Sequence, residues 1–382
     1  MLFKNVLHAA RVAALAAEKP LYAVTGGRLA KGRFLSAVPT EKIGTDVKIV
    51  AESDDSVTLA KFGPDGKILD GDFKILTATD LHLYNDPAVI DLTLQKFADR
   101  VRETKPDLIL ITGDSVVSRW QQLDAVQFAA FMDRFGVYWA YCFGNHEARE
   151  EKGPFKERLF DSLCRGRYSL CRYGKPELFG VGNYAIDILA GENTLRETLV
   201  LLDSGRDILD ERRRKDGVPD GVDGYDYIKP EQTAWYLSHL AACRKKYGAA
   251  KNMLFFHIPV PEFAEVWEQG EDGRFTPTGK ADLLYGWQNE SVGASPFNSG
   301  LFDAAAANGC DAIFCGHDHM NGWAAKLRGV TLVYTQAGDY GGCYAPDNFR
   351  KLGIPEKDWY LGATLTTLHP DGEFTVEPVI GR

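Results

Sequence analysis

The chain has 382 residues, a length that predicts either two domains or one large α/β domain with an extension. Its 45% hydrophobic and 25% charged residues are typical of a globular protein and exclude the disordered and fibrous classes. The net charge of −9 argues against general nucleic-acid binding, because such binders need a basic face that displaces counterions.

The first 20 residues predict an amphipathic helix. His8, Arg11 and Glu18 interrupt the apolar stretch that a signal peptide requires, and no run approaches the ~18 apolar residues of a membrane span. The 7 cysteines are odd in number and form no CxxC pair, which favours free thiols over a disulfide framework or a zinc ribbon. We therefore expect a cytoplasmic protein without a membrane span.

Residues 20–72 contain glycine-rich turns and a segment typical of short antiparallel strands, with a turn at Pro64-Asp65-Gly66. We expect residues 1–72 to form an N-terminal helix and a short β extension, and residues 73–382 to form the main domain. The segments 148–182, 203–228 and 260–298 are expected to be long loops, which often cover a functional site.

Five short apolar runs follow residue 72, and each ends in polar residues. Their Ile, Leu, Val and aromatic content predicts buried strands of a sheet covered on both faces. The runs span residues 73–79, 107–112, 137–143, 252–256 and 311–315. Helical patterns lie between them, at 87–104, 122–135, 229–247 and 299–309. This alternation predicts an α/β fold with functional residues gathered where strands end.

The residues at these strand ends are of types that bind metal ions. Each one alone has an ordinary explanation, such as a capping aspartate, a turn or a core histidine. Their recurrence at five successive strand ends indicates a single site instead. The set consists of Asp80, His82, Asp114, Asn145, His146, His257, His317 and His319.

The segment FCGHDHMNG contributes two histidines of this set. In an extended chain, His317 and His319 would point to one side and Asp318 to the other. Asp318 is therefore interpreted as a cap or turn residue. The three histidines outside the set are assigned to a helix surface or a loop: His8, His239 and His369.

Imidazole, carboxylate and amide ligands without a thiolate favour Mn, Fe, Zn, Co or Ni, and argue against a structural zinc site or a calcium cage. Seven such residues are too many for one ion. They predict two divalent ions about 3.5–4 Å apart that share a bridging carboxylate. The pocket would be cationic within an acidic chain, because two divalent ions outweigh the charges of Asp80 and Asp114.

The motifs DLH, GDSV, GNHE, a lone histidine and GHDH, in this order across about residues 73–340, resemble the signature of the calcineurin-like metallophosphoesterase superfamily. The resemblance implies two mixed β-sheets packed as a sandwich flanked by helices. It also implies two ligand groups that share Asp114 as the bridge. The first metal ion would be bound by Asp80, His82, Asp114 and His319, and the second by Asp114, Asn145, His257 and His317.

Two further segments, LLDSG (201–205) and FFHIPVPE (255–262), resemble the branch that contains fungal and plant proteins named after purple acid phosphatases. The purple enzymes carry a tyrosine ligand three residues after the bridging aspartate, where this chain has Val117. They also lack the counterpart of His82. We therefore expect no purple iron charge-transfer band.

The resemblance implies hydrolysis of a phosphomonoester or phosphodiester by a hydroxide that bridges the two metal ions. His146 is not counted as a ligand and is predicted to hydrogen-bond the phosphate or protonate the leaving alkoxide; a structural role behind the ligands is the alternative. Glu147 is expected to orient His146, and Arg149 is a candidate contact for the substrate phosphate. Asn321 and residues 340–342 are candidates for the pocket edge.

Two other classes compete with this reading. A protein-binding scaffold could keep the fold without turnover, but such scaffolds usually lose ligands or the counterpart of His146, and this sequence retains them. A metal peptidase is the third class, but the chain contains no HExxH motif.

Overall fold

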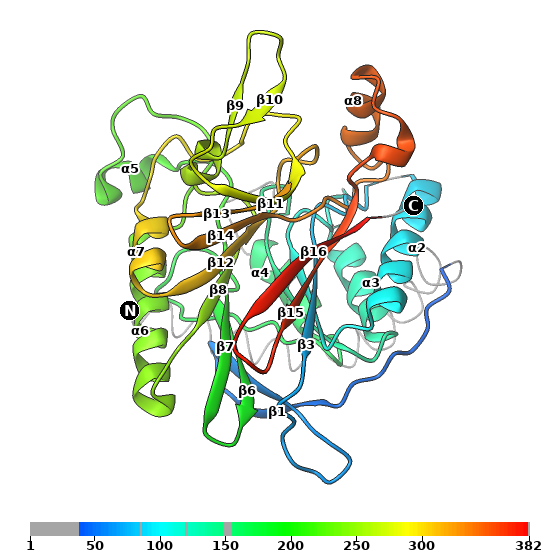
Figure 1. The fold of residues 1–382 in the computed structure, drawn as a ribbon, viewed down its shortest axis with the longest axis vertical. Helices are drawn as coiled ribbons and strands as arrows, with labels where there is room; N and C mark the ends of the chain where they lie inside the picture. Colours follow the sequence, from blue (N-terminus) through cyan, green and yellow to red (C-terminus); the bar gives the residue numbers. More distant parts are fainter. Residues whose placement is uncertain (1–37, 85, 119–120, 148–154, 381–382) are drawn as a thin grey trace.

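The computed structural model describes residues 38–84, 86–118, 121–147 and 155–380. These residues form two mixed β-sheets layered between helices, which confirms the predicted sandwich (Figure 1). The larger sheet has nine strands. In spatial order they are β1 (Val47–Glu52), β2 (Ser56–Lys61), β6 (Tyr184–Gly191), β7 (Thr194–Leu201), β8 (Asn252–Phe255), β12 (Cys310–Cys315), β14 (Val330–Tyr334), β13 (Gly322–Leu327) and β11 (Asp282–Trp287).

The smaller sheet has five strands, and the three at one edge of it are parallel. All five strands predicted from the apolar runs are present, but they are divided between the sheets. Three of them lie here, β3 (Phe73–Ala78), β4 (Leu108–Thr112) and β5 (Tyr138–Cys142), whereas β8 and β12 belong to the larger sheet. In spatial order the strands of the smaller sheet are β16 (Phe374–Ile380), β15 (Gly362–Leu368), β3 (Phe73–Ala78), β4 (Leu108–Thr112) and β5 (Tyr138–Cys142).

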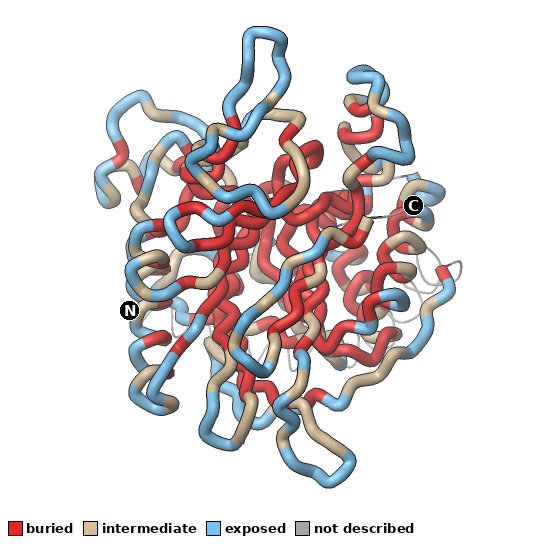
Figure 2. Tube along the Cα trace, in the orientation of Figure 1, coloured by how far each residue is buried: buried red, intermediate tan, exposed pale blue. Residues whose placement is uncertain are grey.

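Apolar side chains fill the space between the sheets, where the chain is buried in Figure 2. The rings of Phe255 and Phe314, on neighbouring strands, stack with their centroids 4.5 Å apart, and Trp139 and Tyr141 are fully buried. Burying a large apolar side chain contributes about 1.5–3 kcal/mol. This packing fixes the strands relative to one another, and with them the positions of their ends.

Four helices match those predicted from the sequence. Helices α2 (Pro87–Thr104) and α3 (Gln121–Asp133) pack beside the smaller sheet, and α6 (Pro230–Tyr247) and α7 (Leu301–Ala307) pack on the larger one (Figure 1). The Asp86 carboxylate caps α2 by accepting a hydrogen bond from the backbone N–H of Ala88 at 2.9 Å. Gly248 ends α6 in the left-handed conformation, with φ of 83°.

The antiparallel strands predicted before residue 73 are β1 and β2. Strand β2 also pairs in parallel with β6, so this hairpin extends the larger sheet. The predicted turn follows β2, where the N–H of Gly66 donates to the carbonyl of Gly63 at 3.0 Å. The helix predicted in the first 20 residues lies outside the described residues.

The segments expected to be loops contain short elements that their sequences did not reveal. They include α4 (Phe155–Cys164), α5 (Asp210–Asp216), η2 (Pro261–Glu265), β9 (Trp267–Gln269), β10 (Phe275–Pro277) and β11. Helix α8 (Ala345–Lys351) and η3 (Glu356–Asp358) precede β15. Among the described residues, no helix has both the length and the apolar character needed to cross a membrane.

Candidate metal centre

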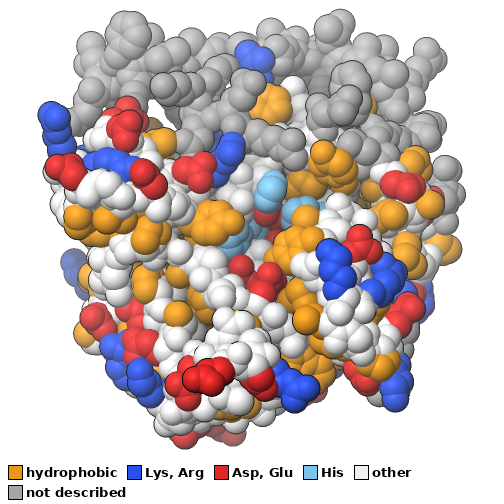
Figure 3. All heavy atoms as spheres, turned by 90° about the horizontal axis from the view of Figure 1, so that it is seen from above, with side chains coloured by type: hydrophobic (Ala, Val, Ile, Leu, Met, Phe, Trp, Pro, Cys, Tyr) orange, Lys and Arg blue, Asp and Glu red, His pale blue; other side chains and the backbone are white. Residues whose placement is uncertain are grey.

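The predicted ligands meet where both sheets present the ends of their strands. The smaller sheet brings Asp80 and His82 after β3, Asp114 after β4 and Asn145 after β5, and the larger sheet brings His257 after β8 and His317 and His319 after β12. Figure 3 looks onto this end of the molecule and shows histidine and acidic side chains gathered in a hollow. Segments far apart in the sequence thus contribute to one polar cluster.

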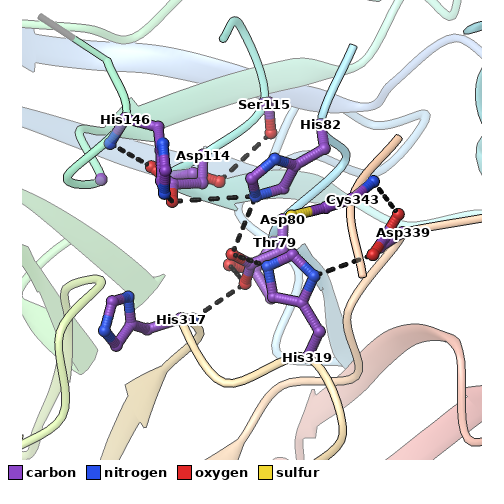
Figure 4. A network of polar contacts seen from close by, with 12 residues as sticks. Thr79, Asp80, His82, Asp114, Ser115, His146, His317, His319, Asp339 and Cys343 are labelled. Carbon is purple, nitrogen blue, oxygen red and sulfur yellow. Dashed lines mark hydrogen bonds and ion pairs between the residues drawn. The ribbon is translucent and has the colours of Figure 1, made fainter. Parts of the chain in front are cut away.

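The four residues expected at the first metal position lie close together (Figure 4). The Nε2 atom of His319 is 3.2 Å from Oδ1 of Asp80. The Nε2 atom of His82 is 3.7 Å from Oδ1 of Asp80 and 3.8 Å from Oδ2 of Asp114. Ligand atoms about 2.0–2.2 Å from a common ion are separated by about 3–4 Å, so this spacing suits a shared cation.

The residues expected at the second position also include Asp114. Ligand atoms of Asp114, His257 and His317 all lie within 4.8 Å of one another. The Nε2 atom of His257 is 3.1 Å from Oδ2 of Asp114. Asn145 is buried on the turn that follows β5. Asp114 therefore belongs to both groups, as expected of a bridge.

Several buried polar atoms of the cluster make no hydrogen bond with the described protein. They are Oδ1 of Asp80, Nε2 of His82, Oδ1 of Asn145 and Nε2 of His257. Leaving a buried polar atom unsatisfied costs about 1–3 kcal/mol. Metal ions at the two positions would satisfy these atoms, so the residues present fit a dinuclear centre.

The backbone of the cluster is held in an uncommon conformation. Asp80, His82, Asp114 and His317 have positive φ angles of 52°, 42°, 49° and 81°. Among the described residues, only two other non-glycine positions share this feature. Such a conformation costs on the order of 1–3 kcal/mol and persists where the surroundings impose it, often at functional sites. The strain is concentrated where the ligands are.

Two motif glycines allow the strand ends to touch. A Cβ atom on Gly144 would lie 2.2 Å from Oδ1 of Asp114. On Gly316 it would lie 2.0 Å from Oγ1 of Thr79 and 2.5 Å from Oδ2 of Asp80. Any side chain at either position would displace a carboxylate from the centre.

The extended geometry predicted for residues 317–319 is wrong. Strand β12 ends at Cys315, and the N–H of Asp318 donates to the carbonyl of Gly316 at 3.1 Å in a turn. Both imidazoles still reach the centre, because the left-handed backbone at His317 redirects the chain. His317 and His319 approach the two carboxylates from different directions (Figure 4).

The turn role of Asp318 is confirmed. Its carboxylate accepts hydrogen bonds from the N–H of Gly293 at 2.8 Å and from the hydroxyl of Tyr334. Burial raises its pKa to about 7. Asn321 similarly holds a neighbouring loop, since its Oδ1 accepts from the N–H groups of Asn289 and Glu290 at 3.1 and 3.2 Å.

The second nitrogens of two candidate ligands are anchored by other residues. His257 Nδ1 donates to the carbonyl of Thr112 at 2.8 Å, and His319 Nδ1 lies 3.0 Å from Oδ2 of Asp339. Such contacts fix the ring orientation and leave Nε2 facing a metal ion. Sequence reasoning missed Asp339; the available signal was an aspartate shortly after the apolar run of β14.

Cys343 was also missed by the sequence analysis, which assumed a site without sulfur. Its Sγ and ligand atoms of His82 and His319 lie within 4.8 Å of one another. Its backbone N–H donates to Oδ1 of Asp339 at 2.7 Å, which places the thiol at the first metal position (Figure 4). Cys343 directly follows residues 340–342, which are predicted for the pocket edge.

Protons stabilise the cluster when no metal is bound. Burial disfavours a charged imidazole, but Asp114 and Asp80 outweigh it and raise the pKa of His257 to about 10. Burial and the charge of His319 lower the pKa of His82, but the hydrogen bond to Asp80 raises it. The net result is a pKa raised to about 9. Ligand imidazoles must lose these protons before they bind a metal ion. Metal ions and protons therefore compete for the same carboxylates.

Because metal ions and protons compete, we expect metal occupancy to rise with pH and the stability of metal-free protein to fall with pH. Metal occupancy will fall as the pH drops from 8 to 4, which metal analysis after dialysis at each pH measures. In metal-free protein, the raised pKa values of His82 and His257 stabilise the fold fully below about pH 6.5, and this contribution is lost as the pH rises through 9–10. The Tm of metal-free protein will therefore fall over this range more than that of metal-loaded protein. Full occupancy at pH 4 would contradict the expectation.

His146 lies at the rim of the cluster rather than inside it. Its side chain is 44% exposed, and its Nε2 is 3.9 Å from Oδ2 of Asp114. Its backbone N–H donates to Oδ1 of the same carboxylate at 2.8 Å. Burial of part of the ring lowers the pKa of His146, although Asp114 opposes this shift. An exposed imidazole next to the bridging carboxylate can reach a bound substrate and solvent.

The expectation that Glu147 orients His146 is not met by its contacts. Its buried carboxylate accepts hydrogen bonds from the backbone N–H groups after β4 and β5 and from the hydroxyl of Tyr141. The backbone donors are Asp114 at 2.8 Å, Ser115 at 2.6 Å, Val116 at 3.0 Å and Gly144 at 2.7 Å. Glu147 therefore joins the two strand ends and positions Asp114.

We predict that Glu147→Gln destabilises the fold and weakens metal binding. The amide has one acceptor oxygen where two are used, and hydrogen bonds to a charged group are worth about 1.5–3 kcal/mol each. Thermal unfolding of the metal-loaded and metal-free variant measures both effects. Glu177→Gln, at an exposed position, is the matched control and should leave both properties unchanged. Equal Tm values for the two variants would contradict the role given to Glu147.

The remaining sequence predictions concern one arginine, two histidines and one loop. Arg149 lies outside the described residues. His369 is half-buried in a loop, as predicted, with its Nδ1 3.0 Å from Asp72. His239 lies on helix α6, as predicted, but it is half-buried and its ring contacts Asp187 and Cys243. The segment 203–228 reaches the centre, since the ring of Tyr225 meets that of His317 edge-on at 4.3 Å between centroids.

A two-sheet α/β sandwich with an Asp, Asn and His cluster at its strand ends defines a class of metal-binding hydrolases. The family described as "Calcineurin-like phosphoesterase" matches residues 73–321, and the chain belongs to this family. Members of this family bind a dinuclear metal centre. The resemblance deduced from the motifs is therefore confirmed.

Similar proteins include a probable inactive purple acid phosphatase 29 of Arabidopsis thaliana, which is 28% identical over 302 residues covering 70% of this chain and 72% of the relative. Phosphatase DCR2 of Saccharomyces cerevisiae is 27% identical over 281 residues, 67% of this chain and 46% of that protein. A crystal structure of a dimetal phosphatase from Danio rerio is 15% identical with a TM-score of 0.47, covering 78% of this chain and 93% of that one.

Proposed function

We propose that the protein is a dinuclear metal-dependent phosphoesterase that hydrolyses a phosphomonoester or a phosphodiester. The observation that carries the proposal is the convergence of six candidate ligands on one buried cluster, with Asn145 buried on the turn after β5 and His146 beside Asp114. The ligands are Asp80, His82, Asp114, Asn145, His257, His317 and His319, and the bound ions would be chosen from Mn, Fe, Zn, Co and Ni. Family membership supports the same reaction class.

When bound, two divalent ions neutralise charge on the phosphate oxygens and lower the pKa of water from 15.7 towards about 7. The chain's own residues prepare the site for this chemistry. Asp114 supplies a carboxylate to both positions, and Asp339 and the Thr112 carbonyl hold two imidazoles with Nε2 facing inward. His146 is placed to hydrogen-bond the phosphate and to give a proton to the leaving alkoxide.

Substrate access involves residues from the long loops. Tyr225, on the segment after β7, presents an exposed ring against His317. Glu290, on the segment before β12, accepts from the N–H of Met320 at 2.6 Å and so borders the first metal position. These contacts of Tyr225 and Glu290 support the expectation that residues 203–228 and 260–298 select the substrate.

A second candidate, a non-catalytic binding protein of the same fold, has one observation in its favour. Relatives from Arabidopsis thaliana carry the words "probable inactive" in their names. The retained ligand set and His146 favour turnover in this chain. The two candidate functions differ in whether the metal-loaded protein hydrolyses phosphate esters, which can be measured directly.

The test is a screen of phosphomonoesters and phosphodiesters with metal-stripped protein to which Mn, Zn, Fe, Co and Mg are added separately. The proposal expects two bound ions per centre and hydrolysis with at least one metal. Binding of two ions without hydrolysis of any ester would favour the non-catalytic candidate. Failure to bind a metal pair would overturn the dinuclear centre itself.

A further inference from the structure

A second cluster of metal-binding side chains lies on the outer face of the larger sheet, away from the candidate dinuclear centre. His239 and Cys243 are one turn apart on α6 and share a face of that helix. Beneath them are Asp187 in β6 and Thr198 in β7, which are paired across the two strands. The cluster joins α6 to the sheet on which it packs.

Three donor atoms of this cluster face one point. The Nε2 atom of His239 is 3.1 Å from Oδ1 of Asp187 and 3.5 Å from Sγ of Cys243. The sulfur is 3.7 Å from the same Oδ1. Asp187 and Cys243 are buried, and the side chain of His239 is 14% exposed, which leaves an approach from solvent.

These separations match those around a tetrahedral zinc ion. With Zn–N and Zn–O distances of about 2.0–2.2 Å and a Zn–S distance of about 2.3 Å, tetrahedral angles place the ligand atoms about 3.3–3.7 Å apart. The two separations that involve sulfur fall in this range, and the 3.1 Å between His239 and Asp187 is slightly shorter. We propose that Asp187, His239 and Cys243 form a mononuclear zinc site, separate from the dinuclear centre. A mixed nitrogen, oxygen and sulfur set favours zinc among the common divalent ions.

The charge of the cluster is compatible with burial of the ion. One Zn²⁺ with the Asp187 carboxylate and a Cys243 thiolate sums to zero. Binding releases the proton shared by His239 and Asp187 and the thiol proton of Cys243, so two protons leave as two positive charges enter. Thr198 holds the carboxylate in place, since its hydroxyl donates to Oδ1 of Asp187 at 2.8 Å. A water molecule can complete the coordination from the exposed side.

The proposed site is distant from the catalytic cluster. Thr198 pairs with Asn252 at the start of β8. His257 lies five residues further along the chain, beyond the other end of that strand. At about 3.3 Å per residue this is a separation of about 17 Å. The zinc ion would anchor α6 to the sheet rather than take part in phosphoester hydrolysis, so it is independent of the proposed function.

The test uses the full chain loaded with excess Co²⁺, followed by removal of free metal. We expect three bound ions per chain and a near-ultraviolet thiolate-to-cobalt charge-transfer band. Cys243→Ser should bind two ions, lose the band and keep its hydrolytic rate. The matched control is Cys164→Ser, which alters a half-buried thiol whose Sγ donates to the carbonyl of Cys171 at 3.6 Å. This variant should keep three ions and the band.

Other outcomes would overturn the proposal. Two bound ions without a charge-transfer band in the unaltered protein would show that the cluster is an ion pair with a neighbouring thiol. A band that disappears in Cys343→Ser but persists in Cys243→Ser would place the thiolate at the dinuclear centre instead. Should Cys243→Ser fail to fold, His239→Gln provides the same readout, because it removes a ligand and leaves the thiol in place.

Discussion

Asp114→Asn is expected to remove both metal ions and to lower the rate of ester hydrolysis by at least about 10³-fold. Asp114 is the residue expected in both ligand groups, and its Oδ2 lies 3.8 Å from Nε2 of His82 and 3.1 Å from Nε2 of His257. Loss of a residue behind the ligands costs 10–100-fold in metal affinity, so loss of a bridging ligand should exceed about 100-fold. Metal ions contribute several kcal/mol to catalysis, and each 1.36 kcal/mol is a factor of ten.

The matched control is Asp318→Asn. Asp318 is also a buried aspartate near the centre, but its carboxylate binds Gly293 and Tyr334 instead of facing the ligands. This variant should retain two ions and most of the activity. Metal analysis and ester hydrolysis on both variants separate a ligand from a structural carboxylate. Two tightly bound ions in Asp114→Asn would mean that the carboxylate is not the bridge.

Loss of metal from Asp114→Asn must be distinguished from misfolding of this variant. Asp114 also accepts from the N–H of His146 at 2.8 Å, a bond that an asparagine oxygen can keep. A cooperative unfolding transition in the metal-free state would therefore assign the loss of metal to missing charge. At pH 7 the metal-free variant should have a lower Tm than the metal-free wild type, because burial disfavours the His257 imidazolium, Asp114 outweighs this and raises its pKa to about 10, and asparagine cannot do so.

The parts of the fold predicted from the sequence are those with a simple local cause. Strands β3, β4, β5, β8 and β12 are apolar on both faces because they are buried on both sides, so their runs stand out from the surrounding sequence. Polar residues at their ends could then be collected as one set. The division of these strands between two sheets follows from long-range pairing, which the runs themselves do not encode.

The parts of the site that were missed depend on contacts remote in sequence. Asp339 lies 20 residues from His319, and its role exists only because β14 pairs beside β12. The His317 turn was misread because an alternating pattern does not reveal a left-handed residue. Glu147 follows the ligand Asn145 closely, yet its partners are backbone groups after β4, which no side-chain pattern could indicate.

The cluster around His239 also combines residues that are remote in the sequence, so the sequence did not reveal it. The spacing of His239 and Cys243 was readable as one helical face, but Asp187 comes from a strand more than 50 residues earlier. Metal sites drawn from one helix and one strand have no compact motif. The five ordered motifs of the main centre are recognisable only because each immediately follows a buried strand.

His146→Ala is the variant that best separates turnover from metal binding. Its imidazole is exposed at the rim, edge-on to His82 with 5.4 Å between ring centroids. Because it is not expected to bind metal, the variant should retain two ions and the wild-type Tm. The hydrolysis rate should fall by about 10²–10⁴-fold, the usual contribution of a positioned acid or base.

The dependence on the leaving group identifies what His146 does. A proton donated to the leaving alkoxide matters most when that alkoxide is strongly basic, so alkyl phosphates should lose more rate than p-nitrophenyl phosphate. His369→Ala is the matched control, because this histidine lies in a distant loop against Asp72. An equal loss with both kinds of substrate would reassign His146 to phosphate binding, and an unchanged rate would remove it from the reaction altogether.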